Sequence, residues 1–330
     1  MKVLFIGGTG IISSACSQLA IERGFDLYLL NRGQTTKRPI PVGARVLHGD
    51  IHDPESIKAA MGRQDFDVVV DWIAFTPEQV ETDLSLFRGR TGQYIFISSA
   101  SAYQTPPSHQ PVTESTMLDN PYWLYSRNKI ACEERLVQAY RSEKFPMTIV
   151  RPSHTYDKTA LPVDGGYTVV NRMRKGKKVI VHGDGTSLWV LTHHSDFAKG
   201  FVGLMGNSHT IGEAFHITSD ELLNWNQIFE LVARAAGVQA DIVHVLSDLI
   251  AAFDPNWGAG LLGDKTNSMI FDNSKIKRFV PDFAATIPFS GGVEEIMAWY
   301  DADPARQVVD EAHDQLMDRI ISAYELAWPK

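Results

Sequence analysis

The chain has 330 residues, of which 44% are hydrophobic and 21% charged, and its formal net charge is −8. This composition is that of an ordinary globular protein with one large domain or two smaller ones, and it disfavours a disordered or fibrous chain. No apolar run reaches the ~18 residues that a membrane helix needs, and the N-terminal apolar segment is too short for a signal peptide, so we expect a cytoplasmic protein. The acidic balance argues against a broad nucleic-acid-binding surface.

The cysteines and one basic run give little evidence about function. Cys16 and Cys132 each fall inside a predicted helix, so buried thiols are expected rather than a disulfide, and no metal-ligand spacing is present. The run 172–178 holds five cationic side chains. It is either a local anion site or a solvated helix end and turn.

The N-terminal segment predicts a strand that runs into a phosphate-binding turn. Residues 2–6 form a short apolar run, and Gly7-Gly8-Thr9-Gly10 then opens an amphipathic stretch over 11–23. Glycines at such a turn let the backbone approach a pyrophosphate, which the N-terminus of the helix attracts. Ser13 stands where a third glycine is usual, but it is small enough for close packing of helix and strand. Cofactor binding is therefore favoured over a purely structural turn.

Strand-like and helix-like segments alternate as far as Arg151, which predicts an α/β protein with a doubly wound parallel sheet. Strands are expected at 2–6, 26–30, 44–47, 67–73, 93–98 and 147–151, and helices at 11–23, 54–61, 77–88 and 122–141. Helices are then expected at about 195–206, 224–236, 273–279, 291–300 and 304–326. We predict a dinucleotide-binding domain at 1–160 and a smaller, mainly substrate-binding domain at 161–330, from which about 183–206 returns to the first.

Tyr125 and Lys129 form a candidate proton-transfer pair. Four residues apart on one helix, they lie within about 40° of the same face. An ammonium beside a phenol favours the phenolate, so we expect Lys129 to lower the pKa of Tyr125 toward the working pH. The spacing alone is common on surface helices. The glycine turn, together with Ser99 at the end of the strand 93–98, makes the catalytic interpretation the stronger one.

Three motifs together resemble the extended short-chain dehydrogenase/reductase family, which contains NAD(P)-dependent sugar epimerases and dehydratases. They are Gly7-x-x-Gly10, Ser99 four residues before Tyr103, and Tyr125-x-x-x-Lys129. The segments 183–186, 194–198 and 272–275 also fall where that family has motifs. Through 71–92 and 96–100, the chain further resembles the branch that holds the chloroplast stem-loop-binding proteins. The resemblance implies a Rossmann fold.

The resemblance also implies catalytic roles. Tyr125 would remove the proton of a sugar hydroxyl while hydride passes to the nicotinamide, Lys129 would assist it and hold the nicotinamide ribose, and Ser99 would orient the substrate. Ser98 is the alternative to Ser99, but strand alternation sends it to the opposite face. The residues expected to face the substrate are Ser99, Ser101, His154 and Trp189. His154, which replaces a common Asn, either donates a hydrogen bond to the substrate or is structural.

The cofactor contacts follow the ends of the strands. They are expected at Gly7, Thr9, Gly10, Ile11, Ile12, Asn31, Arg32, Asp50, Ile51, Ala74, Phe75, Lys129, Pro152, Ser153 and His154. Asn31 stands where NAD-binding members usually carry an acidic residue, and Arg32, with Lys37 and Arg38 nearby, can pair with a 2′-phosphate. NADP is therefore preferred over NAD. Alternatively, Arg32 is a solvated loop residue or stacks on the adenine.

One position departs from the nucleotide-sugar members, which usually carry Arg followed by Asp where this chain has Trp189 and Val190. An indole cannot replace a bidentate phosphate ligand, although it can stack on a sugar ring. The substrate then lacks a nucleotide diphosphate, or another cation contacts the phosphate, or Trp189 belongs to the core. The candidate cations are Arg172, Arg174 and Lys178.

These observations predict an NAD(P)-dependent oxidoreductase or epimerase that acts on a hydroxyl or keto group of a sugar or nucleotide sugar. The alternative is a non-catalytic RNA-binding or regulatory protein with a dinucleotide fold. Retention of Ser99, Tyr125 and Lys129 favours the enzyme. The helices at 77–88 and 122–141 form the usual dimer surface of the family, so a homodimer is expected, with a small-molecule substrate and no membrane, metal or nucleic-acid partner.

Overall fold

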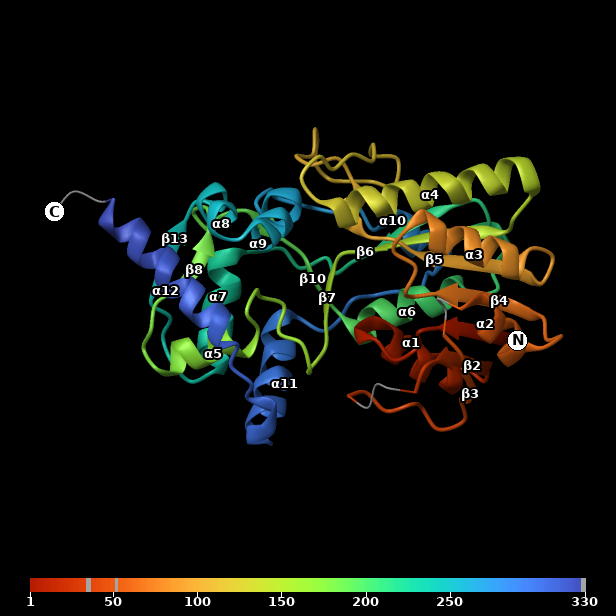
Figure 1. Ribbon diagram of the computed structural model, residues 1–330, viewed down its shortest axis with the longest axis horizontal. Helices are drawn as coiled ribbons and strands as arrows, with labels where there is room; N and C mark the ends of the chain where they lie inside the picture. Colours follow the sequence, from red (N-terminus) through yellow and green to blue (C-terminus); the bar gives the residue numbers. More distant parts are fainter. Residues whose placement is uncertain (34–36, 51–52, 328–330) are drawn as a thin grey trace.

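The computed structural model describes residues 1–33, 37–50 and 53–327, and its first half is organised around one sheet. Seven parallel strands lie in the order β11-β6-β5-β4-β1-β2-β3 (Figure 1). Their bounds are β1 (Lys2–Ile6), β2 (Asp26–Asn31), β3 (Arg45–His48), β4 (Phe66–Asp71), β5 (Thr91–Ile97), β6 (Met147–Pro152) and β11 (Ala214–Ile217). The order reverses at β1, which has β2 on one side and β4 on the other. This is the switch point at which doubly wound sheets bind ligands, and the predicted fold class is confirmed.

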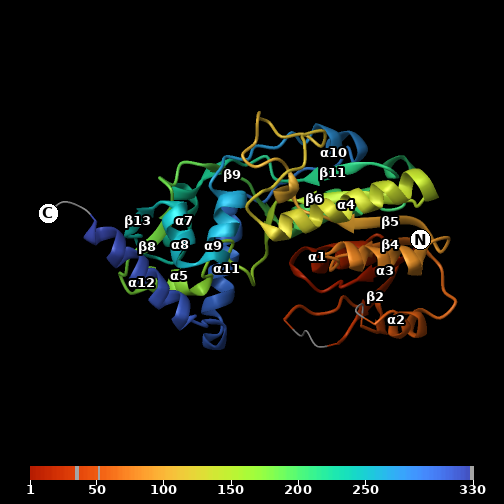
Figure 2. The ribbon, with the colours of Figure 1, turned by 45° about the horizontal axis from the view of Figure 1, so that its top comes forward.

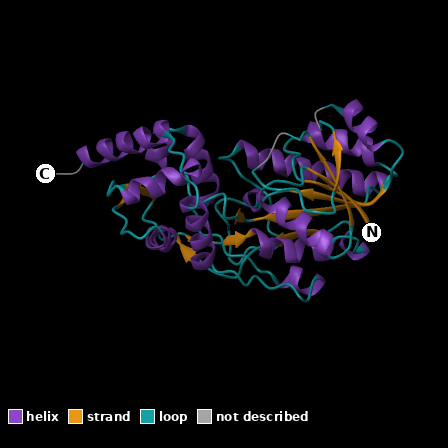
Figure 3. Ribbon diagram, turned by 90° about the horizontal axis from the view of Figure 1, so that it is seen from below, coloured by secondary structure: helices purple, strands orange, loops and turns teal. Residues whose placement is uncertain are grey.

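Helices cover both faces of the sheet, because successive residues of a strand point to opposite sides. Val3 and Phe5 pack on one face, and Leu4 and Ile6 pack on the other. The first face carries α1 (Ile11–Glu22) and α6 (His194–Leu204), and the second carries α2 (Pro54–Met61), α3 (Pro77–Phe87) and α4 (Leu124–Glu143). Figure 3 shows the strands enclosed by these helices. Burial on both faces explains the continuous apolar run Val68-Val69-Val70.

The elements predicted for the first half lie within two residues of those in the structure. The helix expected at 77–88 begins at Pro77, where Thr76 and Gln79 form a capping box. The helix expected at 122–141 is α4, which ends where Lys144 takes a left-handed backbone with a φ of 59°. Periodicity and cap residues therefore locate the elements that carry the site.

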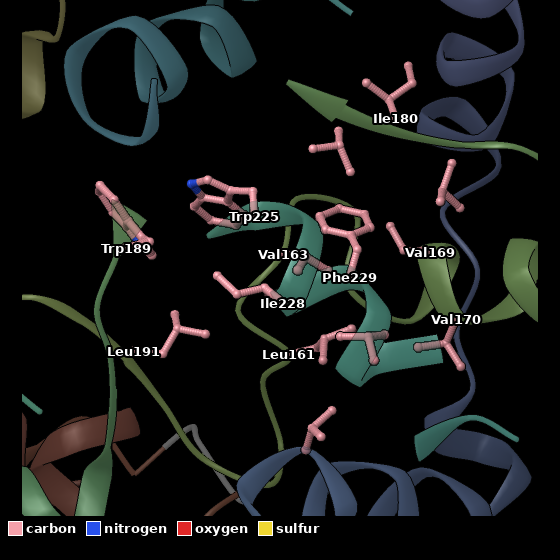
Figure 4. Packing of buried hydrophobic residues seen from close by; sticks show 14 of the residues in the cluster. Leu161, Val163, Val169, Val170, Ile180, Trp189, Leu191, Trp225, Ile228 and Phe229 are labelled. Carbon is pink, nitrogen blue, oxygen red and sulfur yellow. The ribbon is translucent and has the colours of Figure 1, made fainter. Parts of the chain in front are cut away.

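The second half contains short strand pairs and helices around a separate core. The pairs are β7 (His154–Tyr156) with β10 (Leu191–His193), β9 (Leu188–Trp189) with β12 (Leu223–Asn224), and β8 (Val179–His182) with β13 (Ile242–Val245). The helices are α5 (Tyr167–Arg174), α7 (Trp225–Ala235), α8 (Ser247–Phe253), α9 (Pro255–Gly260), α11 (Phe289–Asp301) and α12 (Glu311–Leu326). They gather at the end of the molecule away from the sheet (Figures 1 and 2). Trp189, Trp225 and Phe229 belong to the core between them (Figure 4).

Two features of the second half differ from the predictions. The helices α5, α8 and α9 were not predicted. The helix expected at 304–326 is interrupted: a 3₁₀ turn at Pro304–Arg306 precedes α12, which begins only at Glu311. The side chain of Asp310 accepts a hydrogen bond of 3.0 Å from the backbone N–H of His313 and so caps α12.

Three later segments pack on the first half. The helix α6 lies against α1, the strand β11 pairs with β6, and α10 (Ser274–Phe279) contacts both β11 and α6. By contrast, Trp189 and Leu191 pack in the core of the second half. The proposed division at residue 160 stays a prediction. Within the described residues, no helix combines the length and the apolar character needed to cross a bilayer.

Candidate active site

The turn after β1 has the geometry of a phosphate-binding loop. Gly7 has a φ of +86°, and a Cβ there would lie 2.7 Å from Ile73. A Cβ at Gly8 would lie 2.5 Å from Leu29. The hydroxyl of Ser13 accepts from the N–H of Gly10 at 2.7 Å and donates to the carbonyl of Gly7 at 3.0 Å. Ser13 thus closes the turn, and this rigid glycine loop at the N-terminus of α1 fits a dinucleotide pyrophosphate.

Several residues expected near the adenosine already contact other side chains of the protein. Arg32 is 57% exposed and lies 4.0 Å from the carboxylate of Asp50. The suggestion that Arg38 assists it is wrong, because Arg38 donates to Asp157 at 2.5 Å and to Thr159 at 2.6 Å. Lys37 lies over the ring of Trp299, with its Nζ 5.7 Å from the centroid. Ile51, the other predicted contact, lies outside the described residues.

Lys129 joins three elements beneath the predicted nicotinamide site. The side chain is 1% exposed, and its Nζ donates hydrogen bonds of 2.7 Å to the carbonyls of Ala74 and Ile97. The Nζ also lies 4.6 Å from the ring centroid of Phe75. Burial opposes the charged form and lowers the pKa of Lys129 to about 8. The ammonium therefore ties α4 to the ends of β4 and β5.

Tyr125 and Ser99 meet as the sequence predicted, but the pKa of Tyr125 does not move in the predicted direction. Both side chains line the same cavity, and the Ser99 hydroxyl is close enough to act on the phenol. Burial raises the pKa of Tyr125, the Ser99 hydroxyl lowers it, and the charge of Asp264 raises it. The Nζ of Lys129 lies 5.8 Å from the centroid of the Tyr125 ring. The expectation that Lys129 lowers this pKa was wrong, because desolvation of the phenol outweighs the attraction.

A cavity of about 270 Å³ gathers several predicted residues from both halves of the chain. Those that line it are Ser99, Ser101, Tyr125, Pro152, Ser153, His154 and Trp189. Ser98 is buried and is not part of the described lining, which favours Ser99 as the oxygen-binding residue. Sequence reasoning missed several lining residues, namely Trp123, Asp264, Lys265, Met269 and Phe271. Asp264 and Lys265 belong to no recognisable motif, and no element was predicted around them.

His154 and Trp189 form one unit of the cavity wall. The indole N–H of Trp189 donates to Nδ1 of His154 at 3.1 Å, and its ring centroid lies 5.6 Å from that of Trp225. Burial and the charge of Lys265 lower the pKa of His154 to about 3. The imidazole is therefore neutral with its proton on Nε2, where it can serve as a hydrogen-bond donor. Trp189 is both a core residue and a wall residue, so these two interpretations do not compete (Figure 4).

Four of the five cations in the basic run 172–178 are paired with acidic side chains. Arg172 is 1% exposed and donates to Asp314 at 2.6 Å and Asp318 at 2.7 Å. The remaining ion pairs of the run join Arg174 to Asp301, Lys177 to Asp314 and Asp318, and Lys178 to Glu325. The interpretation of these residues as a local anion site is therefore wrong, because acidic side chains of α11 and α12 already pair with them.

The fold and these motifs agree with a known family. A model of the NAD dependent epimerase/dehydratase family matches residues 3–218, more than half of the chain. The chain belongs to this family. Its membership confirms the resemblance to the extended short-chain dehydrogenases.

Individual relatives are distant. The chloroplast stem-loop binding protein of 41 kDa b from Arabidopsis thaliana is 28% identical over 258 residues, which cover 74% of this chain and 65% of that protein, just under two thirds of its length. The epimerase Mth375 from Methanothermobacter thermautotrophicus has a TM-score of 0.76 at 16% identity, covering 93% of this chain and 94% of its own. The UDP-glucuronic acid 4-epimerase from Bacillus cereus, solved with UDP-glucuronic acid and NAD, has a TM-score of 0.73 at 18% identity, covering 92% and 99%. At these identities the structures establish the shared epimerase/dehydratase fold.

Proposed function

We propose that the protein is an NAD(P)-dependent oxidoreductase or epimerase that acts on a hydroxyl or keto group of a sugar or nucleotide sugar, with Tyr125 as the base. The observation that carries the proposal is that Tyr125 and Ser99 lie together in the wall of one cavity, where the Ser99 hydroxyl acts on the phenol. Two hydroxyls held together in this way can share one substrate oxygen. The family membership and the NAD complex of the Bacillus cereus relative support the choice of cofactor.

The proposed cofactor path runs from the glycine turn to the cavity. The turn and the first N–H groups of α1 would hold the pyrophosphate through Gly7, Thr9, Gly10, Ile11 and Ile12. The adenosine would lie by Asn31, Arg32 and Asp50, and the nicotinamide half by Ala74, Phe75, Pro152, Ser153 and His154. When bound, the cofactor takes up or returns the hydride of the substrate carbon. Because Arg32 is exposed and Asn31 is uncharged, we retain a preference for the 2′-phosphate of NADP.

The proton chemistry rests on Tyr125. As the substrate carbon loses its hydride, the Tyr125 phenolate takes the hydroxyl proton and Ser99 keeps a hydrogen bond to the same oxygen, which becomes a carbonyl. Burial and the charge of Asp264 disfavour this phenolate, whereas the Ser99 hydroxyl favours it. In the reverse direction, Tyr125 returns the proton to the oxygen.

The oligomer expected for this enzyme is a homodimer through α3 and α4. The exposed side of these helices carries bidentate pairing of Arg135 with Glu81 and an ion pair between Arg88 and Glu143. These pairs fix the two helices against each other. They would give a partner subunit one rigid surface to pack on.

A second candidate function is RNA binding, and its support is the relative named as a stem-loop binding protein. The net charge of −8 and the ion pairs of the run 172–178 weigh against it, since phosphate contacts need free cations. Salt-dependent binding of a stem-loop RNA, measured by filter retention, would separate this function from the enzymatic one.

The deciding experiment is the substitution Tyr125→Phe, which removes the phenol oxygen. In Tyr125→Phe, turnover of any sugar that the parent protein oxidises or epimerises should fall at least about 100-fold, because the base is lost. Cofactor affinity, measured by fluorescence titration, should stay close to that of the parent. Full activity in this variant would refute the mechanism.

A further inference from the structure

Asp264 is a carboxylate in the cavity wall that the mechanism above does not use. It comes from a single π-helical turn, Leu261–Lys265 (η3), and lines the same cavity as Tyr125. It is close enough for its charge to act on Tyr125. Among the described residues, its carboxylate oxygens have no hydrogen-bond donor, and the charge of the neighbouring Lys265 is the only one that favours its ionised form. A partly buried hydrogen-bond acceptor thus lines the space where a substrate would lie.

Hydrogen bonds from Asn120 connect the turn that carries Asp264 to the Ser99–Ser101 segment. The amide Nδ2 of Asn120 donates to the carbonyl of Gly263 at 2.6 Å and to the carbonyl of Ser101 at 2.8 Å. A Cβ at Gly263 would lie 2.8 Å from the Cβ of Trp123, so the turn packs directly on the start of α4. Asn120 therefore sets the position of Asp264 relative to the Ser99–Ser101 segment.

Side chains from the second half of the chain also hold this turn. The carbonyl of Lys265 accepts hydrogen bonds of 3.0 Å from Nε2 of His182 and from the hydroxyl of Ser187. The hydroxyls of Ser247 and Thr266 meet at 2.8 Å. Single π turns occur frequently at functional sites, and the backbone of this one is held by hydrogen bonds on two sides. Such an arrangement is that of a preorganised binding site.

The residues that line the cavity indicate which class of ligand it can bind. Its polar groups are hydroxyls, the neutral His154, one carboxylate and one ammonium, and the described lining contains no arginine. The Nζ of Lys265 lies 5.8 Å from the ring centroid of Trp123 and 3.5 Å from the carbonyl of Gly260, and its charge acts on Asp264. A diphosphate here would face the carboxylate of Asp264 and a single cation. Sugar hydroxyls, in contrast, donate to a carboxylate, and aromatic faces such as Trp123 pack on the C–H face of a sugar ring.

We propose that Asp264 is a substrate-binding carboxylate that accepts hydrogen bonds from the hydroxyls of an uncharged sugar, with Lys265 donating to a neighbouring sugar oxygen, and that it excludes nucleoside diphosphates from the cavity. This assignment rests on the function proposed above, which left sugar and nucleotide sugar open. It makes Asp264 the residue that determines specificity.

The test compares two classes of probe in the full chain with NADP⁺ present. Tryptophan fluorescence would follow the binding of UDP-glucose and of four free sugars, namely D-glucose, D-galactose, D-xylose and L-fucose. In Asp264→Asn, the sugar that the parent binds best should lose at least tenfold in affinity, and UDP-glucose should bind severalfold more tightly. Asp264→Glu, which keeps the charge, should exclude UDP-glucose as the parent does. Glu230→Gln, which removes an exposed charge on α7, should behave as the parent with both probes.

Three results would overturn the assignment. They are a parent protein that binds none of the free sugars, an Asp264→Asn variant that binds sugar as the parent does, or UDP-glucose affinity that is the same in both. A failure of the proposed function alone would give a different result. Sugar binding would then depend on Asp264, but Tyr125→Phe would keep full turnover. If Asp264→Asn unfolds, Lys265→Met provides the second variant, with a predicted loss of sugar affinity.

Discussion

The Nζ of Lys129 donates a 2.7 Å hydrogen bond to the carbonyl of Ala74, which binds the middle of the chain to the loop after β4. The N–H of Ala74 is itself held by Asp71 Oδ1 at 2.8 Å. Asp71 lies beside Asp83, whose pKa is raised by burial and by the charge of Asp71, and Asp83 accepts from Tyr94 at 2.5 Å. Lys129, the proposed catalytic lysine, thus lies at one end of a connected series of buried polar groups.

The burial of Lys129 predicts a pH-dependent stability. Its pKa falls from 10.5 to about 8 on folding, so between these values the unfolded chain holds a proton that the folded chain has lost. The contribution of Lys129 to the free energy of unfolding therefore rises with pH across this window, by up to about 3 kcal/mol. The free energy of unfolding of the parent relative to that of Lys129→Met, measured in urea, should therefore rise from pH 7 to 10.5. Lys158→Met removes an exposed lysine and should keep the parental slope; equal slopes in all three proteins would contradict the prediction.

The hydroxyl of Ser99 should tune Tyr125. Since the Ser99 hydroxyl lowers the pKa of Tyr125, Ser99→Ala should move the rising, acidic limb of the rate profile for oxidation, and the ultraviolet titration of the phenol, to higher pH. We also expect turnover to fall roughly 10- to 100-fold. The neighbouring Ser98→Ala is the matched control, because that hydroxyl is buried and unpaired among the described residues. A shift of equal size in both variants would argue against the assignment of Ser99.

Cofactor choice should depend on Arg32. We expect NADPH to bind more tightly than NADH, and Arg32→Ala to remove the difference, because Arg38 is already paired with Asp157. Fluorescence titration with both cofactors measures this. Arg63→Ala, at another exposed arginine, should keep the preference. Equal affinities in the parent would show that Asp50 cancels the charge of Arg32.

The buried pair of Arg151 and Glu133 should dominate the stability of the first half. Arg151 donates from Nε at 2.9 Å and from Nη2 at 2.5 Å, and both side chains are almost fully buried. Glu133→Gln should lower the free energy of unfolding by roughly 3–5 kcal/mol, since it leaves a buried cation uncompensated. Urea unfolding of the double variant with Arg151→Met should recover part of that loss. No recovery would mean that the residues act independently.

The sequence was most informative where local rules govern. Short apolar runs located the strands of the sheet, and the glycine turn and Tyr125-x-x-x-Lys129 identified one side of the site. Pairs formed by distant residues had no such signal: Arg38 meets Asp157 at a separation of 119 positions. The direction of the pKa of Tyr125 depends on burial, and Asp264 reaches the cavity through packing of a π turn, so neither can be read from spacing.

The position of α6 and β11 affects how the protein can be divided. Phe201 of α6 packs on Trp72 with ring centroids 4.7 Å apart, and β11 covers the backbone of β6. A fragment cut near residue 160 would expose both an apolar face and an unpaired strand edge, the two features that promote aggregation. Any attempt to exchange or express the nucleotide-binding part separately must therefore carry the stretch through residue 217 with it.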